Sequence, residues 1–372
     1  KSIKKTQPSF LLKDMLFSKQ KVVYLAELLN AVQNDFNNDQ FIKQSLDAFV
    51  SLELKERMTF LTKQIDTYIT GDYKTVINKL IKSLPKDNIK EDFIFGPYCE
   101  YVATFGCDKK YLNISFNALS EFTSYFSGEF AIRDFINQFP DETLNQVNIW
   151  SKSKLTSQRR LASEGSRPKL PWAKGITLDY KRGSKVLDNL FYDNERYITR
   201  SVANHINDLS KIDADYTLSI LKKWKKSGKQ NSKEMDYIIN HGTRTLIKKG
   251  NVEALNLIGF KQDFKVEVNN FIIKNETIKV NNYLEFSFDL VAKDDQNLLI
   301  DFGIIFPSIK KTSPKVFKIK KIKLQKNKTI SINKKLLFRP MTTRRLYQGK
   351  HILFLQINGK IIKEKSFILE MK

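Results

Sequence analysis

The segment RRLASEGSRPKLPWAK, which begins at Arg159, holds a carboxylate, guanidinium groups and an indole within a few residues. Arg160 and Glu164 stand four positions apart, so a short helix places both side chains on one face. Gly165 is expected to end that helix, because glycine adopts the left-handed backbone conformation at little cost. The spacing therefore predicts an ion pair at the end of a helix.

The residues after this expected stop stiffen the chain. Pro168 and Pro171 forbid helix, so Trp172 is expected on a rigid extended segment close to the ion pair. A carboxylate and an aromatic ring held together in this way could stabilise a cation. Spacing alone also fits a structural role, in which Arg160 and Glu164 form an ordinary surface pair and Trp172 anchors two helices.

The first two thirds of the chain predict a series of short helices. Apolar residues recur at helical spacing in KQKVVYLAELLNAV and in the stretch that ends at Thr70. Glycine and proline separate the apolar stretches, and this pattern favours stacked helical hairpins. Further helices are expected over 74–84, 92–105, 115–126, 128–139, 142–152, 157–164, 193–209, 215–225 and 232–248.

A faint internal repeat supports stacking. RRLASE begins at Arg159 and RSVANH begins at Arg200, 41 positions later, and RTLIKK begins at Arg244, 44 positions further on. A period of about 40 residues is typical of two-helix HEAT-type units, although chance among arginine-rich helices would give similar echoes. The pattern predicts an α-solenoid of HEAT-like helical repeats.

Near residue 260 the apolar period changes from that of a helix to that of a strand. YLEFSFDL alternates apolar and polar residues, and KVFKIKKIKL and KTISINKKLLF are strand-like with basic outer faces. HILFLQI and KIIKEKSFIL flank Asn358-Gly359, a dipeptide that favours a type I′ hairpin turn. Seven or eight short strands predict an immunoglobulin-like β-sandwich over 261–372, after a helical domain over 1–260.

The charge of the chain points to a polyanionic partner. The 372 residues include 64 Lys+Arg and 40 Asp+Glu, a net charge of +24, and 302–363 contains 17 basic residues and no acidic ones. Nucleic acid is the simplest partner for such a surface, although a basic ribosomal or membrane-surface protein would have a similar composition. No apolar run approaches the length that spans a bilayer. The two cysteines suggest reduced thiols in a cytosolic protein rather than a disulfide framework.

The segment RLASEGSRPKLPW closely resembles the signature of AlkC-type bacterial alkylpurine DNA glycosylases, the HEAT-like-repeat enzymes that also include AlkD. GPYCEYVATFG from Gly96, SGEFAIRDFI from Ser127 and RSVANHINDLSK from Arg200 resemble further family segments in the same order. TTRRLYQGKHILFLQINGK from Thr342 resembles part of the immunoglobulin-like domain found in many members. The resemblance covers most of the chain.

The resemblance implies base excision repair of double-stranded DNA with alkylated bases, above all 3-methyladenine and 3-methylcytosine, without base flipping. Methylation at a ring nitrogen makes the base cationic, so it leaves as a neutral molecule without prior protonation. The chemistry then requires a carboxylate beside an oxocarbenium-like sugar and a positioned water. Glu164 and Trp172 occupy the catalytic Glu and Trp positions of the family, and no metal or cofactor is expected.

Two further acids match family positions. Glu129, in GEFAIR, looks like the second family carboxylate, although it could instead stabilise the dipole of the helix expected from residue 129. Asp208, in HINDLS, could face the same cleft or serve as a helix-end cap. Both are catalytic candidates.

Basic residues of the matching segments are candidates for phosphate contacts, since guanidinium groups suit phosphate oxygens. Each of them could equally be an ordinary surface residue, and Lys169 stands where Arg is common in the family. The candidates are Arg133, Arg159, Arg160, Arg167, Lys169, Arg200, Arg244, Arg344 and Arg345.

A DNA glycosylase in the cytoplasm, associated with the nucleoid and without an obligatory protein partner, is the function expected from these features. Two alternatives compete with it: a non-catalytic repeat protein that binds distorted or branched DNA, and a protein–protein adaptor. The presence of both Glu164 and Trp172 argues against the first, and the acid-free basic window argues against the second.

Overall fold

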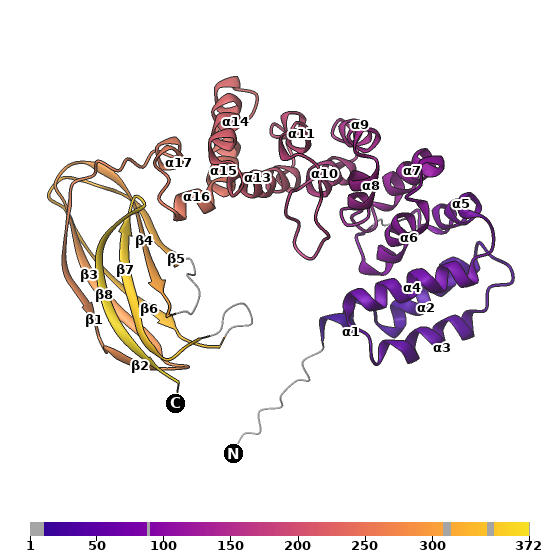
Figure 1. The fold of residues 1–372 in the computed structure, drawn as a ribbon, viewed down its shortest axis with the longest axis horizontal. Coiled ribbons are helices and arrows are strands. Elements are labelled where there is room, and N and C mark those ends of the chain that lie inside the picture. Colours follow the sequence, from indigo (N-terminus) through magenta and orange to yellow (C-terminus); the bar gives the residue numbers. More distant parts are fainter. Residues whose placement is uncertain (1–10, 88–89, 308–313, 341–345, 372) are drawn as a thin grey trace, which may run out of the picture. The chain divides into compact units, whose positions relative to one another are not determined.

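The computed structural model describes residues 11–87, 90–307, 314–340 and 346–371, and the chain forms two compact units (Figure 1). One unit comprises Lys1–Leu209 and Ser227–Ile238, and the other comprises Ser210–Lys226 and Ile239–Lys372. The predicted division at 260/261 follows the change from helix to strand and stays a prediction, because the two compact units alternate along the sequence. In the described ranges, no helix has both the length and the apolar character required to cross a membrane.

Short helices build the first unit. Side-chain caps start several of them: Ser18, Asn37 and Asp72 each accept a hydrogen bond from a main-chain N–H of the first turn. The helices are α1 (Leu12–Leu16), α2 (Lys19–Asn30), α3 (Asn38–Phe49), α4 (Leu54–Tyr68), α5 (Tyr73–Ser83), η1 (Phe93–Phe95), α6 (Gly96–Gly106), η2 (Lys109–Tyr111), α7 (Leu112–Phe122), α8 (Ile132–Gln138), α9 (Pro140–Trp150), α10 (Thr156–Gly165), α11 (Tyr180–Ser184), α12 (Leu187–Leu190) and α13 (Arg196–Ser210).

Several expected helix boundaries differ from the structure; for example, the helix expected over 115–126 is α7, which begins at Leu112 and ends at Phe122. The helix expected over 128–139 begins only at Ile132, because residues 128–131 form a turn. The helix expected over 232–248 is two helices, α15 (Ser232–Gly242) and α16 (Arg244–Lys248), which are separated at Thr243.

Hydrogen bonds between residues about 40 apart connect successive helix pairs of the first unit. Several of them join residues that are 41 positions apart in the sequence, which is also the separation of Arg159 and Arg200. They include Thr59–Glu100, Arg133–Lys174, Asn148–Asn189 and Arg167–Asp208. The predicted stacking of helical repeats is therefore confirmed for this unit.

The β-sandwich predicted for the C-terminal part is also confirmed. Its strands are β1 (Val266–Ile273), β2 (Thr277–Lys279), β3 (Tyr283–Ala292), β4 (Gln296–Ile305), β5 (Lys315–Leu324), β6 (Thr329–Leu337), β7 (Gly349–Ile357) and β8 (Lys360–Glu370). They form a three-stranded sheet in the order β1-β3-β6 and a five-stranded sheet in the order β2-β8-β7-β4-β5. All pairs are antiparallel except β2 with β8.

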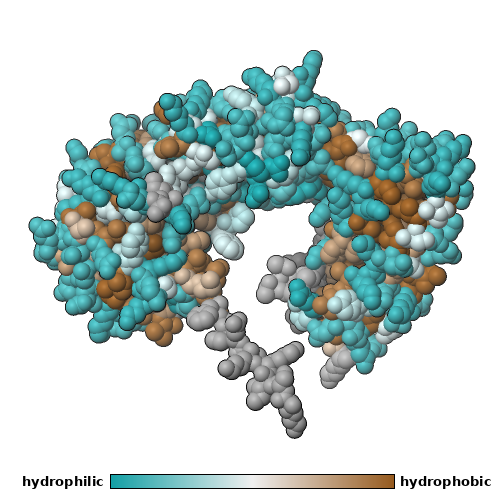
Figure 2. Space-filling view, turned by 180° about the vertical axis from the view of Figure 1, so that it is seen from behind, coloured by the Kyte–Doolittle hydropathy of each residue, from teal (hydrophilic) through white to brown (hydrophobic). Residues whose placement is uncertain are grey.

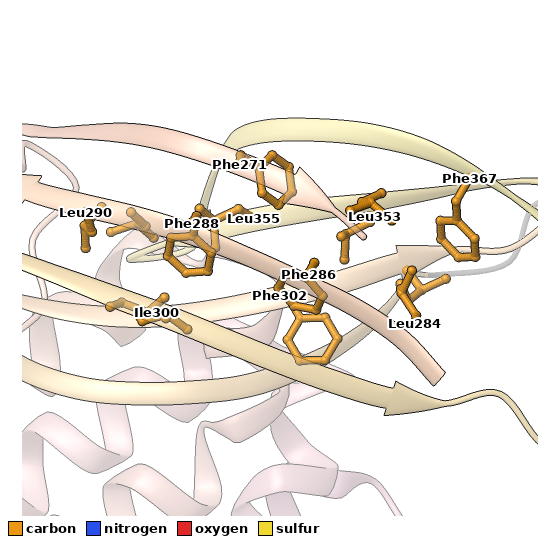
Figure 3. Close-up of a cluster of buried hydrophobic side chains, with 14 of the residues drawn as sticks. Phe271, Leu284, Phe286, Phe288, Leu290, Ile300, Phe302, Leu353, Leu355 and Phe367 are labelled. Atoms are coloured by element: carbon orange, nitrogen blue, oxygen red, sulfur yellow. The ribbon is translucent and has the colours of Figure 1, made fainter. Parts of the chain in front are cut away.

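The sandwich core follows from alternation along the strands. In β3 every second residue is buried, and these side chains meet those of the opposite sheet in the cluster of Figure 3. The cluster includes Phe271, Leu284, Phe286, Phe288, Leu290, Ile300, Phe302, Leu353, Leu355 and Phe367.

Helices α14 (Ala214–Ser227, up to Lys226), α16 and α17 (Val252–Leu257) belong to the same compact unit as the sandwich. Leu218 of α14 and Leu255 of α17 share an apolar cluster with Leu299 of β4. The β7–β8 turn also contacts this region, because Nδ2 of Asn358 donates to the carbonyl of Lys261. In this turn Asn358 and Gly359 have φ values of 45° and 76°. Positive φ at both positions agrees with the predicted type I′ turn.

The basic segment without acidic residues, 302–363, contains β5, which is an edge strand of the five-stranded sheet. Lys318, Lys320 and Lys323 are exposed, whereas the isoleucines between them are half-buried against the core. In the view of Figure 2, hydrophilic residues cover most of the surface of each unit and hydrophobic ones form separate patches. The exposed edge of β5 therefore carries positive charge, as the sequence pattern predicted.

Candidate active site

Helix α10 places Arg160 and Glu164 on one face, as their spacing predicts. Nη2 of Arg160 lies 3.9 Å from Oε1 of Glu164. The helix ends at Gly165, but the reason differs from the predicted one, because Gly165 does not have a positive φ. A Cβ at this position would lie 2.5 Å from Cγ2 of Ile132, so close packing against α8 requires the glycine.

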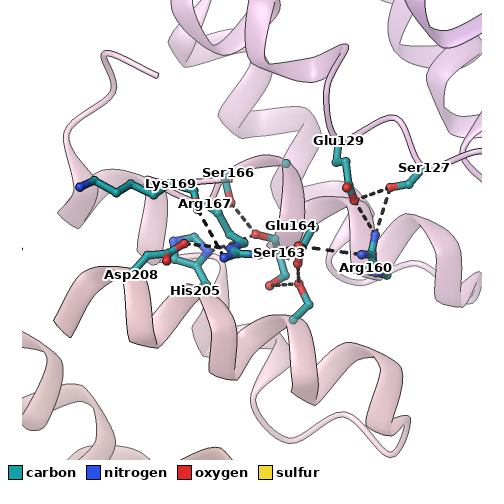
Figure 4. Close-up of polar contacts among 12 residues, drawn as sticks. Ser127, Glu129, Arg160, Ser163, Glu164, Ser166, Arg167, Lys169, His205 and Asp208 are labelled. Atoms are coloured by element: carbon teal, nitrogen blue, oxygen red, sulfur yellow. Dashed lines mark hydrogen bonds and ion pairs between the residues drawn. The ribbon is translucent and has the colours of Figure 1, made fainter. Parts of the chain in front are cut away.

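The Glu164 carboxylate is buried and each of its oxygens has a strong partner (Figure 4). Nη1 of Arg167 lies 2.6 Å from Oε1, and the Ser201 hydroxyl donates to Oε2 at 2.5 Å. Bonds of this kind hold a carboxylate in one orientation. Glu164 is therefore preorganised, with only a small part of its surface exposed.

Arg167 connects Glu164 with Asp208. Its Nε lies 2.9 Å from Oδ2 of Asp208, and all three side chains are buried. Burial opposes the charged form of the Arg167 guanidinium, but Asp208 and Glu164 outweigh this effect and raise its pKa. Arg167 thus forms an ion pair with each of two carboxylates.

One face of α13 supports this arrangement. Ser201, His205 and Asp208 lie at helical spacing, and all of them contact the end of α10 or the residues that follow it. Nδ1 of His205 lies 3.1 Å from the carbonyl oxygen of Ser163. Burial lowers the pKa of His205 to about 3, so the imidazole is neutral and supports the helix without adding charge.

Glu129 lies in the turn before α8, not at the start of a helix. Its Oε2 accepts hydrogen bonds from Arg160 Nη1 at 2.6 Å and from the Ser127 hydroxyl at 2.9 Å (Figure 4). The Arg160 guanidinium also lies 4.8 Å from the centre of the Tyr197 ring. Burial opposes the charge of Arg160, yet Glu129 and Glu164 raise the pKa of its guanidinium. Arg160 therefore bridges the two carboxylates.

Trp172 lies in a turn, which corrects the predicted extended presentation. Its φ is 63°, in the left-handed region, and its side chain is 76% exposed. Lys55 of α4 holds the turn, because its Nζ donates to the carbonyl oxygen of Trp172 and lies 5.3 Å from the centre of the Phe130 ring. The exposed indole is thus presented from a backbone that distant residues fix.

Arg133 supports the same turn from within and is fully buried. Its guanidinium donates to the carbonyl oxygens of Gly165, Arg167 and Lys174 at 2.6–3.1 Å. Burial lowers the pKa of Arg133 to about 10. With its donors turned to the main chain inside the protein, Arg133 is placed to hold the loop rather than to meet a phosphate.

The remaining basic candidates lie in different environments. Arg159 pairs with Asp193 at 2.6 Å, whereas Lys169 and Arg200 are exposed. Arg244 belongs to the second compact unit, where it donates to the carbonyl of His241. The predicted contacts Arg344 and Arg345 lie outside the residues that the structure describes.

A cavity of about 760 Å³ in the first unit brings together three of the four catalytic candidates and two of the basic ones. Its lining includes Glu129, Glu164, Arg160, Arg167 and Trp172. Asp208 is joined to this group through Arg167. Among the described residues there is no cluster of three or more His, Cys, Asp or Glu side chains that could hold a metal ion.

Sequence reasoning missed three residues of the site. Ser201 and Ser127 donate to the two carboxylates, and Tyr197 lies against Arg160. The repeat period could have indicated the first, because Ser201 follows Ser163 by 38 positions and their hydroxyls are 2.9 Å apart. The other two depend on side-chain directions that spacing does not reveal.

Comparisons with known proteins agree with the fold. Residues 267–371 match the family described as the C-terminal immunoglobulin-like domain of the uncharacterised protein YhaZ. The chain is 31% identical to YhaZ of Bacillus subtilis (strain 168) over 357 residues, which cover 95% of this chain and 98% of YhaZ. The structure is also similar to that of Pseudomonas fluorescens alkylpurine DNA glycosylase AlkC, which was solved bound to DNA containing an abasic site analog. The two structures compare with a TM-score of 0.88 and a sequence identity of 30%, and the match covers 97% of this chain and 100% of the AlkC chain.

Proposed function

Because the chain belongs to the protein family that includes AlkC and YhaZ, we propose that it is a DNA glycosylase that removes alkylated purines from DNA. The observation that carries this proposal is the cavity in which two preorganised carboxylates, Glu129 and Glu164, lie beside the exposed Trp172. A cleaved glycosidic bond leaves positive charge on the sugar, and fixed carboxylates stabilise that charge without reorganisation.

We propose cationic N3-methylated bases in duplex DNA, namely 3-methyladenine and 3-methylcytosine, as the substrates. Such a base carries its own positive charge and departs as a neutral molecule, so the enzyme requires no general acid. The buried His205, with its pKa of about 3, is neutral at physiological pH and does not supply a proton. Following the resemblance to the family, we further propose that the base is released without being flipped out of the duplex.

Each site residue has a proposed role. Glu164 stabilises the oxocarbenium-like sugar, and Glu129 orients the attacking water or the first carboxylate. Asp208 acts through Arg167, which holds Glu164 at 2.6 Å. Trp172 packs against the lesion or its deoxyribose, where an indole face attracts a cation by about 0.5–2 kcal/mol.

DNA contacts are proposed for exposed cations. Arg200 and Lys169 flank the site in the first unit, and the lysines of β5 belong to the second unit. Each phosphate contact releases counterions, so binding should weaken steeply with salt. Replacing both Lys320 and Lys323 by Gln should lower the slope of log affinity against log salt by about 0.9 for each lysine that binds a phosphate. An unchanged slope would remove these lysines from the proposed interface.

The activity is tested with duplex DNA that carries N3-methyladenine. Free base released by the protein is compared with spontaneous release; no excess would overturn the assignment. Glu164→Gln should slow single-turnover release at least tenfold, because one preorganised electrostatic partner is worth about 3–4 kcal/mol in comparable sites. Trp172→Ala should also slow it at least tenfold, since the upper end of the cation–π range, about 2 kcal/mol, exceeds the roughly 1.4 kcal/mol that a factor of ten requires. Glu142→Gln, at an exposed glutamate of α9, is the matched control and should keep the full rate. DNA as substrate would place the protein in the cytoplasm beside the nucleoid.

A further inference from the structure

The Arg160 guanidinium lies between the two carboxylates, but not midway. Its Nη1 lies 2.6 Å from Oε2 of Glu129, whereas its Nη2 lies 3.9 Å from Oε1 of Glu164. The attraction between a cation and a carboxylate depends on their distance, so a small movement of the guanidinium would redistribute its charge between the two. An arginine side chain is long and loses conformational entropy when it is held in one place. A neighbour that restricts Arg160 would therefore affect both carboxylates.

Tyr197 provides such a contact from α13. The centre of its ring lies 4.8 Å from Cζ of Arg160, and both residues line the cavity. Tyr197 stands four positions before Ser201, so the two side chains lie on the same face of the helix. Ser201 donates to Glu164. One face of α13 thus contacts both Glu164 and the guanidinium beside it.

The Tyr197 ring is itself held by a distant part of the chain. Its hydroxyl donates to Oε1 of Glu91 at 2.9 Å, across 106 positions of sequence. The main chain next to Glu91 is anchored, because the N–H of Asp92 donates to the carbonyl oxygen of Tyr125 at 2.8 Å. Burial raises the pKa of Tyr197 to about 12, so the phenol keeps its proton near neutral pH and remains a donor to Glu91.

We propose that Tyr197 is a positioning residue for base release, whose ring holds the Arg160 guanidinium between the two carboxylates. Glu91 in turn fixes the ring through the phenol hydroxyl. This inference deepens the proposed function and rests on it, because it concerns the charge that Glu129 and Glu164 present to the sugar. Tyr197 acts through Arg160 and not on the base or the sugar itself. Arg160 accordingly belongs to the reaction site rather than to the phosphate contacts.

Single-turnover kinetics on duplex DNA that carries N3-methyladenine separate positioning from binding. Tyr197→Leu removes the ring, and base release at saturating protein should slow at least fivefold. The protein concentration that gives half of the maximal rate should change less than twofold. A fivefold loss corresponds to about 1 kcal/mol, a value within the range of a cation–π contact. Weaker half-saturation at an unchanged maximal rate would make Tyr197 a DNA contact and overturn the proposal.

Further variants separate the ring from its hydroxyl. Tyr197→Phe keeps the ring over Arg160 and loses only the bond to Glu91, so its rate should stay within threefold of the wild type. Glu91→Ala should match Tyr197→Phe, and the double variant should be no slower than either, because both changes remove the same hydrogen bond. A loss in Tyr197→Phe as large as in Tyr197→Leu would assign the effect to the hydroxyl and overturn the role of the ring.

Tyr192→Leu is the matched control. Tyr192 is 40% exposed against 38% for Tyr197, and Lys229 lies 5.4 Å from the centre of its ring. Tyr192 lies outside the described lining of the cavity. The control should therefore keep the full rate of release.

A double-mutant cycle with Arg160→Gln shows whether Tyr197 acts through Arg160. Gln keeps a donor for Glu129 but has no charge, so Tyr197→Leu should slow release less than twofold in this background. Equal losses in both backgrounds would mean that Tyr197 acts on the DNA or only on the packing of α13, and would overturn the proposal. Tyr197→Met, which fills more of the space of the ring, should give the same result if Tyr197→Leu is poorly folded.

The positioning role and the proposed function fail differently. No release by the wild-type protein above the spontaneous rate would overturn the glycosylase function, and the role of Tyr197 with it. Normal release by the wild type, together with an unaffected Tyr197→Leu, would overturn the positioning role alone.

Discussion

Replacing Arg167 by Met separates two roles that are possible for this residue, a phosphate contact and a structural bridge. In the structure its guanidinium lies 2.6 Å from Glu164 and 2.9 Å from Asp208, and its side chain is 8% exposed. We therefore expect the variant to lose stability rather than affinity for DNA. Met keeps the length of the side chain and removes the charge.

The magnitude follows from the burial of the partners. Removing one member of a buried ion pair typically costs about 3–5 kcal/mol, because the remaining charge stays buried without compensation. Here Glu164 keeps Ser201 and the more distant Arg160, at 3.9 Å, while Asp208 loses its bond to the guanidinium. We expect a loss near the middle of that range, which corresponds to a fall in Tm of about 10 °C for a unit of this size.

Chemical denaturation and salt-dependent DNA binding provide the two measurements. Arg200→Met is the matched control, because Arg200 is exposed on α13 directly before Ser201. The control should change the unfolding free energy by less than about 0.5 kcal/mol and lower the salt slope by about 0.9. Arg167→Met should show the opposite pattern, with reduced stability and an unchanged slope.

Two results would refute this reasoning. If Arg167→Met unfolds at the wild-type denaturant concentration, the bridge to Glu164 and Asp208 contributes little to the fold. If it also lowers the salt slope as Arg200→Met does, Arg167 is a phosphate contact whose bonds to the two carboxylates break when DNA binds.

Three further predictions concern stability. The pKa of His205 is about 3 in the folded protein and 6.5 in the unfolded chain. Its contribution to the free energy of unfolding is therefore complete above pH 6.5, and it falls by about 1.4 kcal/mol per pH unit as the pH drops toward 3. The difference in unfolding free energy between wild type and His205→Gln should therefore shrink by about 2 kcal/mol from pH 7 to 5; a constant difference would contradict it. Asp301 behaves in the opposite sense, because burial raises its pKa from 3.8 to about 6. Its contribution to stability is lost as the pH rises through this interval. Asp301→Asn should therefore remove this fall in the free energy of unfolding, measured by urea denaturation at each pH. Gly165→Ala should lower the thermal midpoint, since the added Cβ would lie 2.5 Å from Ile132, whereas an unchanged midpoint would mean that α8 yields freely.

The architecture could be predicted because it depends on local patterns. Apolar periodicity distinguished helices from strands, and Asn358-Gly359 indicated its hairpin turn, which the positive φ of both residues bears out. The errors arose where tertiary packing decides the backbone. Gly165 is required at the end of α10 because Ile132 leaves no room for a Cβ, and Trp172 adopts a left-handed φ in a turn that Lys55 and Arg133 hold from other helices.

The site was harder to predict because the meaning of a charged residue depends on what it contacts. Three arginines of the same segments have different roles in the structure. Arg133 holds a loop, Arg167 bridges two carboxylates and Arg200 is exposed. Part of this distinction was nevertheless available in the repeat. The period of 41 that relates Arg159 to Arg200 also relates Arg167 to Asp208, and those two side chains form an ion pair. In stacked helical repeats, opposite charges one period apart are brought together by the fold, so such an arginine is better assigned to the scaffold than to the nucleic acid.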